Sequence, residues 1–308
     1  MIELVQMKKT RIIVIIIASF LAALFLGLIL FSGSPKNSTQ DKNHQKINIV
    51  TTTDIYAEAA GKVVGNKGTV KSVIDNPHVD PHDFKPTTQT TRFVSNADLV
   101  VSNGLGYDDW VNPIVNKQPW INVGRDIAHK KSGANPHLWF DYEIMEKYTK
   151  YLTAKLSDLQ PENKKYFSTN AKKYLKSMEP IYKKSAVIKS LKSNSFVDVS
   201  EPIFDYALNN LGFTINNPAF SKAIENETDP AIKDAQTVVD DFRNHRVAFY
   251  LHNIQAENNT TKSILKDAKK YQIPILYLTE NKPKNLTYIK WQLDIYDKLE
   301  KLLMNNKN

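Results

Sequence analysis

Short apolar stretches alternate with amphipathic stretches in two separate parts of this chain. In the first part, three short stretches are predicted to be strands, with the apolar bias of a buried strand in the first and the third: residues 46–52, 70–74 and 98–102. The stretches 55–64 and 87–96 between them have helical spacing, and Asp54 is a candidate N-cap for the first of these helices. This alternation of strand and helix predicts a parallel sheet with helices on both faces.

The second part repeats this pattern. Its predicted strands are residues 195–199, 213–216, 247–251 and 273–279. Its predicted helices are residues 204–211, 229–245, 261–271 and 287–303. We therefore expect an α/β protein with two lobes, each built on a mainly parallel sheet flanked by helices.

A helical stretch connects the two parts. Residues 141–191 contain no glycine, and apolar residues recur at three- and four-residue steps. Pro161 is expected to begin a second helix, since proline suits a first helical turn. Pro180 lies inside the pattern and is expected to kink or end the helix. The periodicity fits a helical hairpin as well as it fits one helix that crosses from lobe to lobe.

The N-terminal segment has the pattern of an export signal or membrane anchor. Lys8, Lys9 and Arg11 precede an apolar run over residues 12–31. Its length is about the ~20 residues that a spanning helix needs, and the basic residues place the rest of the chain outside the cell. Residues 1–32 are therefore predicted to be a signal or anchor, with an uncleaved anchor favoured. The polar residues 33–45 are predicted to be a flexible tether.

Composition excludes several classes of site. The chain has no cysteine, which rules out disulfides, thiolate metal sites and lipidation of a cysteine, so any metal must be bound by oxygen and nitrogen. The formal net charge is +9, but lysines and arginines are scattered, without an Arg-rich cluster. This distribution argues against nucleic-acid binding and fits attraction to an anionic envelope surface.

Two proline-histidine segments lie in the first part of the chain. Residues 76–86 contain three prolines and His82, and they follow a predicted strand. Residues 134–141 place His137 directly after a proline, ahead of a predicted helix. In parallel sheets ligands bind beyond the carboxyl ends of strands, so both histidines are candidate ligands at that edge.

These two segments, together with residues 48–52 and 96–104, resemble the manganese- and zinc-binding extracellular proteins of ABC uptake transporters, of the pneumococcal surface adhesin A type. The resemblance runs from about Lys46 to the C-terminus. It implies two lobes joined by one long rigid helix, with a metal ion in the cleft between them. The implied boundaries are residues 46–160 for the first lobe, 161–192 for the linking helix and 193–308 for the second lobe.

The resemblance also implies the ligands. It carries over a set of four, two from each lobe: His82, His137, Glu201 and Glu280. Glu280 stands where the family usually has aspartate, and its side chain is one methylene longer. His78 is the strongest competitor of His82, because it lies in the same segment.

The other histidines and the nearby acidic residues have no matching position in the family. They are His44, His129, His245 and His252, with Glu225, Glu227 and Asp229 expected to be a solvated acidic loop.

Two imidazoles and two carboxylates suit either Zn²⁺ or Mn²⁺ and cancel the charge of a divalent ion. The carboxylate in third position favours Mn²⁺ slightly. We expect a monomer outside the cytoplasmic membrane that captures the ion and delivers it to an ABC transporter permease, without catalysis. The alternatives are a surface adhesin and, less favoured, a metal-dependent hydrolase in which Asp83 or Asp205 acts as acid or base.

Overall fold

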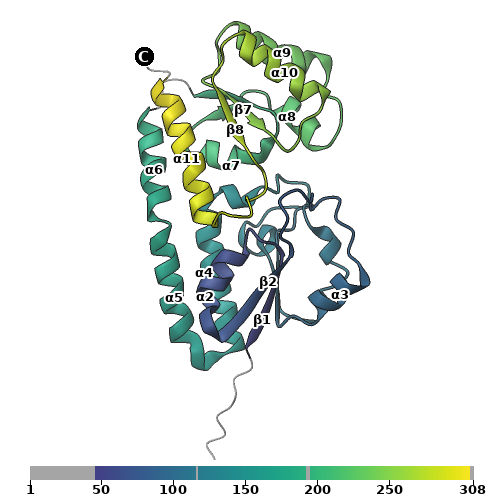
Figure 1. The fold of residues 1–308 in the computed structure, drawn as a ribbon, viewed down its shortest axis with the longest axis vertical. Coiled ribbons are helices and arrows are strands. Elements are labelled where there is room, and N and C mark those ends of the chain that lie inside the picture. The colour runs from purple at the N-terminus through teal and green to yellow at the C-terminus, as the bar shows by residue number, and fades with distance from the viewer. Residues whose placement is uncertain (1–45, 116, 192–194, 306–308) are drawn as a thin grey trace, which may run out of the picture. The chain divides into compact units, whose positions relative to one another are not determined.

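The computed structural model describes residues 46–115, 117–191 and 195–305 (Figure 1). The predicted signal or anchor over residues 1–32 and the tether over residues 33–45 lie outside the described residues. In the described part of the chain, no helix is both long and apolar enough to cross a membrane.

The first sheet is parallel throughout, with the strand order β2-β1-β3-β4. Its strands are β1 (Ile47–Thr53), β2 (Gly68–Ile74), β3 (Leu99–Ser102) and β4 (Trp120–Asn122). Helices α2 (Ala57–Val64) and α3 (Thr88–Ser95) belong to this half of the molecule. Adjacent residues of β1 enter different cores: Ile49 packs in the cluster that includes α2, and Val50 packs in the cluster that includes Val94 of α3. Both faces of the sheet are therefore covered at β1, which explains why two adjacent residues of this strand are both apolar.

The second sheet repeats this topology, with the order β6-β5-β7-β8 and only parallel pairs. Its strands are β5 (Phe196–Val199), β6 (Thr214–Ile215), β7 (Tyr250–Asn253) and β8 (Ile275–Leu278). Its helices are α7 (Asp205–Asn210), α8 (Pro218–Glu225), α9 (Ile232–Arg243) and α10 (Asn259–Lys270). In both sheets the strand order reverses beside the first strand, and such switch points bind ligands at the carboxyl ends of strands.

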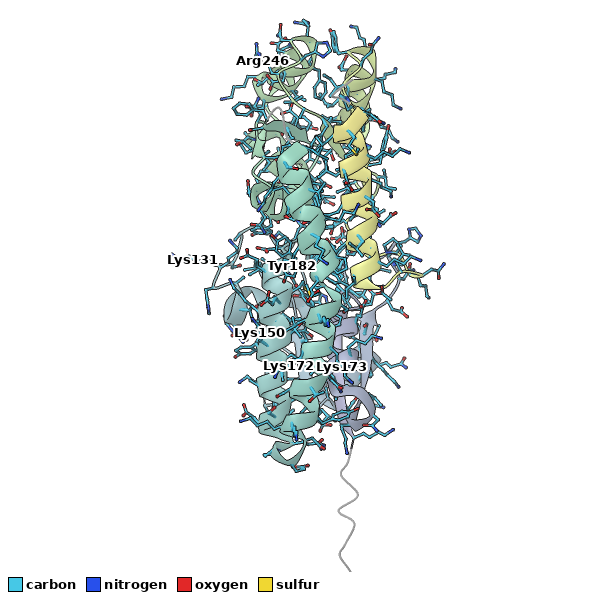
Figure 2. All side chains as sticks on the ribbon, turned by 90° about the vertical axis from the view of Figure 1, so that its left-hand side faces the viewer. Lys131, Lys150, Lys172, Lys173, Tyr182 and Arg246 are labelled. Carbon is cyan, nitrogen blue, oxygen red and sulfur yellow. The ribbon has the colours of Figure 1, made fainter. Side chains whose placement is uncertain are left out.

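A column of helices accompanies the sheets. It consists of α4 (Tyr142–Leu159), α5 (Lys164–Ser177), α6 (Glu179–Leu191) and the C-terminal α11 (Tyr288–Asn305). Figure 2 shows α6 and α11 side by side, with α5 continuing the line of α6. The break between α5 and α6 falls at Met178, two residues before Pro180, because proline has no N–H to donate. The two sheets and the long helical connection confirm the predicted fold class, while the lobe boundaries stay predictions.

Short helical turns link the larger elements. They are η1 (Gly65–Lys67), η2 (Asp109–Val111), η3 (Val123–Ile127), η4 (Leu138–Phe140), η5 (Pro161–Asn163) and η6 (Pro202–Phe204). β4 and α8 were not predicted from the sequence.

The predicted capping role of Asp54 was wrong. Tyr56 is the N-cap of α2 and makes no side-chain cap. The Asp54 carboxylate lies 2.7 Å from the Lys282 ammonium, which follows β8 in the second half of the chain. A partner so distant in sequence could not be read from local spacing.

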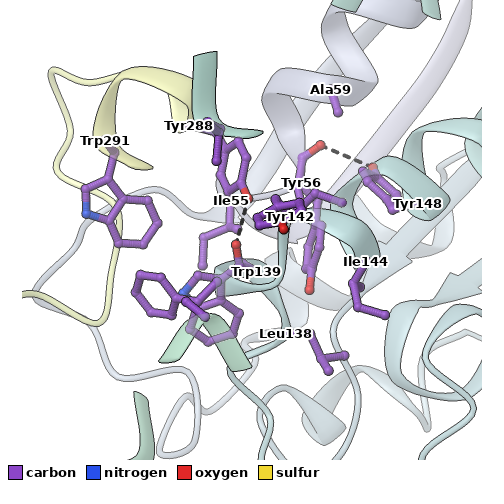
Figure 3. Packing of buried hydrophobic residues seen from close by; sticks show 14 of the residues in the cluster. Ile55, Tyr56, Ala59, Leu138, Trp139, Tyr142, Ile144, Tyr148, Tyr288 and Trp291 are labelled. Atoms are coloured by element: carbon purple, nitrogen blue, oxygen red, sulfur yellow. Dashed lines mark hydrogen bonds between the residues drawn. The ribbon is translucent and has the colours of Figure 1, made fainter. Parts of the chain in front are cut away.

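One apolar cluster joins the two halves of the chain. It contains Ile49 and Leu99 of the first sheet, Val199 of the second sheet, and Trp139 between them. Figure 3 shows the Tyr288 hydroxyl of α11 donating to the Trp139 carbonyl, at 2.7 Å. This shared core fixes the segment beside His137 to both sheets.

Asp198 of β5 is expected to make the protein less stable as pH rises toward 8. Its side chain is fully buried, and neither carboxylate oxygen has a hydrogen-bond partner among the described residues. Burial, with the nearby Asp241 carboxylate, raises the pKa of Asp198 from 3.8 to about 8. Between these values the folded chain holds a proton that the unfolded chain has released, so this group's contribution to stability is lost as pH rises toward 8.

Asp198→Asn should therefore increase the free energy of unfolding at pH 8 by about 1–3 kcal/mol. The gain should shrink as pH falls toward 4, as measured by urea denaturation at both pH values. The control is Asp158→Asn, an exposed position of α4, which should change stability little at either pH. An equal gain at both pH values would contradict the assigned pKa.

Candidate metal centre

A cavity of about 1120 Å³ opens at the carboxyl ends of both sheets. The loop after β2 contributes His78, Asp80 and His82 to its wall. The second half of the chain contributes three glutamates: Glu201 after β5, Glu225 at the end of α8, and Glu280 after β8. Three of the four predicted ligands, His82, Glu201 and Glu280, line this cavity, and the fourth, His137, lies 3.7 Å from Glu280.

His137 is held in one orientation by Asn135. The His137 Nδ1 lies 2.8 Å from the Asn135 side-chain oxygen, which also accepts the His137 backbone N–H. The amide orientation of Asn135 is fixed because its nitrogen donates to the Pro202 carbonyl, at 2.6 Å. An amide oxygen only accepts, so this network places a hydrogen on Nδ1 and turns Nε2 toward Glu280 and Glu225.

The Nε2 of His137 faces two carboxylates. It is buried and has no hydrogen-bond partner among the described residues. It lies 3.7 Å from Glu280 Oε1 and 3.9 Å from Glu225 Oε2. These distances exceed a hydrogen bond. They approach the separation of about 3.4 Å expected between two donors that bind one tetrahedral ion through bonds of about 2.1 Å.

Glu201 joins this group from the switch point of the second sheet. Its Oε2 accepts a hydrogen bond of 2.6 Å from the Asn253 side chain at the end of β7. Burial raises the pKa of Glu201 to about 8; Glu280 and Glu225 add to the rise, and Asn253 and His137 oppose it.

The backbone of Glu280 is bonded to the segment that carries His137. Its backbone carbonyl accepts the Trp139 indole N–H, at 3.2 Å. Burial would raise the pKa of its carboxyl, but His137, Tyr107 and His82 outweigh burial and hold that pKa below its usual value.

The centre has an excess of negative charge. Burial alone would lower the pKa of His137, but Glu225, Glu280 and Glu201 raise that pKa to about 9. The pKa of the neighbouring Asp205 rises to about 7, through burial and Glu225 and against the effect of His137. Carboxylates held this close together favour a bound cation.

His82 is the one exposed side chain among the four predicted ligands. It is exposed on the cavity wall, and its ring lies 4.8 Å from the ring of Tyr107, which also contacts His137 at 6.3 Å. Across the residues described, no group of three or more histidines, aspartates and glutamates is arranged closely enough to hold an ion. The structure places the Glu280 carboxylate 3.7 Å from His137 Nε2, while Glu201 and His82 line the same cavity as Glu280.

The His82 loop is tied to the opposite half of the chain. The Pro77 carbonyl accepts hydrogen bonds from Gln255, at 2.8 Å, and from Asn281, at 3.2 Å. The Tyr107 hydroxyl donates to the Asn281 side-chain oxygen, at 2.9 Å. These bonds span the cavity beside Glu280, so they set how far the histidine loop stands from that ligand.

The expectation that Glu225 is solvated was wrong. Its side chain is only 9% exposed and faces His137. The missed helix α8 places it there, and the sequence carries the signals of that helix: Pro218 in the first turn, then Phe220 and Ile224 four residues apart. His252, by contrast, is buried in β7 and lies 3.3 Å from Glu257; its pKa is lowered, chiefly by burial.

Comparisons with known proteins agree with this architecture. A family model described as zinc-uptake complex component A, periplasmic, matches residues 49–302. The metal ABC transporter substrate-binding lipoprotein ScbA of Streptococcus cristatus is 24% identical over 289 residues, which cover 87% of this chain and 88% of ScbA. The manganese ABC transporter substrate-binding lipoprotein scaA of Streptococcus gordonii is 26% identical over 58% of this chain and 61% of its own length. The iron-transporter counterpart MtsA of Streptococcus pyogenes is 26% identical over 61% of this chain and 66% of its own length.

Solved structures share the fold. The periplasmic zinc-binding protein TroA of Treponema pallidum superimposes with a TM-score of 0.69 at 18% identity, over 84% of this chain and 99% of TroA. The manganese-bound S38A mutant of a periplasmic metal-binding protein from Candidatus Liberibacter asiaticus gives a TM-score of 0.71 at 18% identity, over 84% of this chain and all of that one.

The two sheets and the cavity at their carboxyl ends define a class, the extracytoplasmic metal-binding proteins that serve ABC uptake transporters and are not enzymes. The chain belongs to the zinc-uptake complex component A family. Its cargo is a divalent transition metal, and the relatives' names include zinc, manganese and iron.

Proposed function

We propose that this protein captures Mn²⁺, with Zn²⁺ as the alternative cargo, through His82, His137, Glu201 and Glu280. The observation that carries the proposal is the buried Nε2 of His137, which has no hydrogen-bond partner among the described residues and faces carboxylates from two separate elements. Carboxylate-rich sites suit Mn²⁺ better than sites dominated by imidazole.

Capture also requires His82 to approach the other three ligands. We infer that the ion draws the loop after β2 toward Glu280, because the bonds of Pro77 already connect these segments. The docked permease then separates the two histidine ligands of the first half of the chain from the two glutamate ligands of the second half, and receives the ion. Anchoring of the chain through residues 1–32 belongs to the same proposal.

Alanine variants of His82 and His78 test the assignment of the loop ligand. Both histidines are exposed on the same cavity wall, so each serves as the matched control for the other. His82→Ala is expected to weaken Mn²⁺ binding by at least about 10-fold, because one direct metal bond is lost, while His78→Ala leaves it unchanged. Metal content after purification and chelator competition are the measurements. A loss confined to His78→Ala would transfer the role to that residue.

A further inference from the structure

We propose that Glu225 binds the captured ion directly, as a fifth donor, and that this extra carboxylate tunes the centre toward manganese. The inference rests on the proposed function, because it concerns the same ion in the same cavity.

The position of Glu225 is that of a ligand. It is the last residue of α8, which packs against η6, the turn that directly follows Glu201. Its Oε2 lies 3.9 Å from His137 Nε2, and Glu280 Oε1 lies 3.7 Å from the same nitrogen. Two carboxylates from different elements therefore converge on one imidazole nitrogen that is buried and has no hydrogen-bond partner in the described part of the chain.

The surroundings of Glu225 are unfavourable for a carboxylate without a cation. It stands at the carboxyl end of a helix, where the helix dipole disfavours negative charge. Its side chain is 9% exposed, and two further carboxylates, Glu201 and Asp205, interact with it. Among the described residues its ion-pair partner is His137. A divalent ion would offset all of these effects together.

A fifth donor changes which ion the centre prefers. With Glu225 the set has two imidazoles and three carboxylates. Zn²⁺ prefers four short tetrahedral bonds, whereas carboxylate oxygens suit Mn²⁺ and fill a larger coordination shell. Loss of the Glu225 carboxylate should therefore weaken manganese binding more than zinc binding.

The direct test is Glu225→Gln, with Glu227→Gln as its matched control. Glu227 lies two residues further along and is exposed. We expect Glu225→Gln to weaken Mn²⁺ binding by about 10–100-fold and Zn²⁺ binding by much less, with Glu227→Gln unchanged, as measured by chelator competition with each metal alone. The electron paramagnetic resonance spectrum of bound Mn²⁺ should also change in Glu225→Gln only.

Glu225→Asp distinguishes direct coordination of the ion by Glu225 from electrostatic attraction of the ion by its charge. This variant keeps the charge but withdraws the carboxylate by one methylene, so it should lose Mn²⁺ affinity if Glu225 is a ligand. Wild-type affinity in both Glu225→Gln and Glu225→Asp, with affinity lost in His137→Ala, would overturn this inference and leave the proposed function intact. An unaltered affinity in His137→Ala would overturn the proposed function itself. Equal losses for both metals in Glu225→Gln would overturn the manganese preference.

Discussion

His137→Ala is expected to abolish specific binding of Mn²⁺ and Zn²⁺, with a loss in affinity of at least about 100-fold. His137 is the buried donor on which Glu280 and Glu225 converge, and its orientation is fixed by Asn135. Without the imidazole, the ion loses its one buried nitrogen ligand. Isothermal titration with each metal and elemental analysis of the purified protein are the measurements.

The matched control for this prediction is His252→Ala. His252 is also buried and also lies beside a glutamate, but that glutamate is Glu257, which is not one of the proposed ligands. Metal affinity should persist in His252→Ala, and circular dichroism should report a folded chain for both variants. Retained metal affinity in a folded His137→Ala protein would contradict the proposal that His137 binds the ion.

Trp139→Ala is expected to destabilise the protein by about 3–5 kcal/mol, a large share of the total stability of a typical domain. The Trp139 ring is fully buried and packs against the rings of Tyr107, His137 and Phe140. Its indole N–H also binds the Glu280 carbonyl. The substitution thus removes core packing and a bond that links the two halves of the chain, and guanidinium denaturation measures the loss.

Trp120→Ala is the control for Trp139→Ala. Trp120 lies on β4, an edge strand of the first sheet, and it is only partly buried. Trp120→Ala should lower the free energy of unfolding by less than half as much as Trp139→Ala, because a partly exposed ring buries less apolar surface. Equal effects in the two variants would show that Trp139 does not join the halves in the way the shared core indicates.

Short stretches with an apolar bias predicted most of the strands correctly, because strands covered on both faces need no strict polar alternation. β3, predicted over residues 98–102, is observed over Leu99–Ser102. The three-residue β4 was missed because so short a stretch carries little periodic signal. Asp54 was assigned to the wrong role because its partner, Lys282, lies far away in the sequence.

The centre itself could be predicted only in part. Local patterns indicated that His82 and His137 follow prolines at the edge of the first sheet. The resemblance to a family, rather than any spacing, supplied Glu201 and Glu280. Glu225 was missed because it comes close to His137 only when α8 packs against η6. Such a tertiary contact is not encoded by any local sequence pattern.

A crystal structure of the manganese-loaded protein, with anomalous data collected at the manganese and zinc edges, is the most direct test of the account. We expect one anomalous peak within about 2.0–2.5 Å of His137 Nε2 and of carboxylate oxygens of Glu201 and Glu280, with His82 drawn in to complete the set. A peak bound by other residues, with His137 Nε2 more than about 3 Å from the ion, would contradict it.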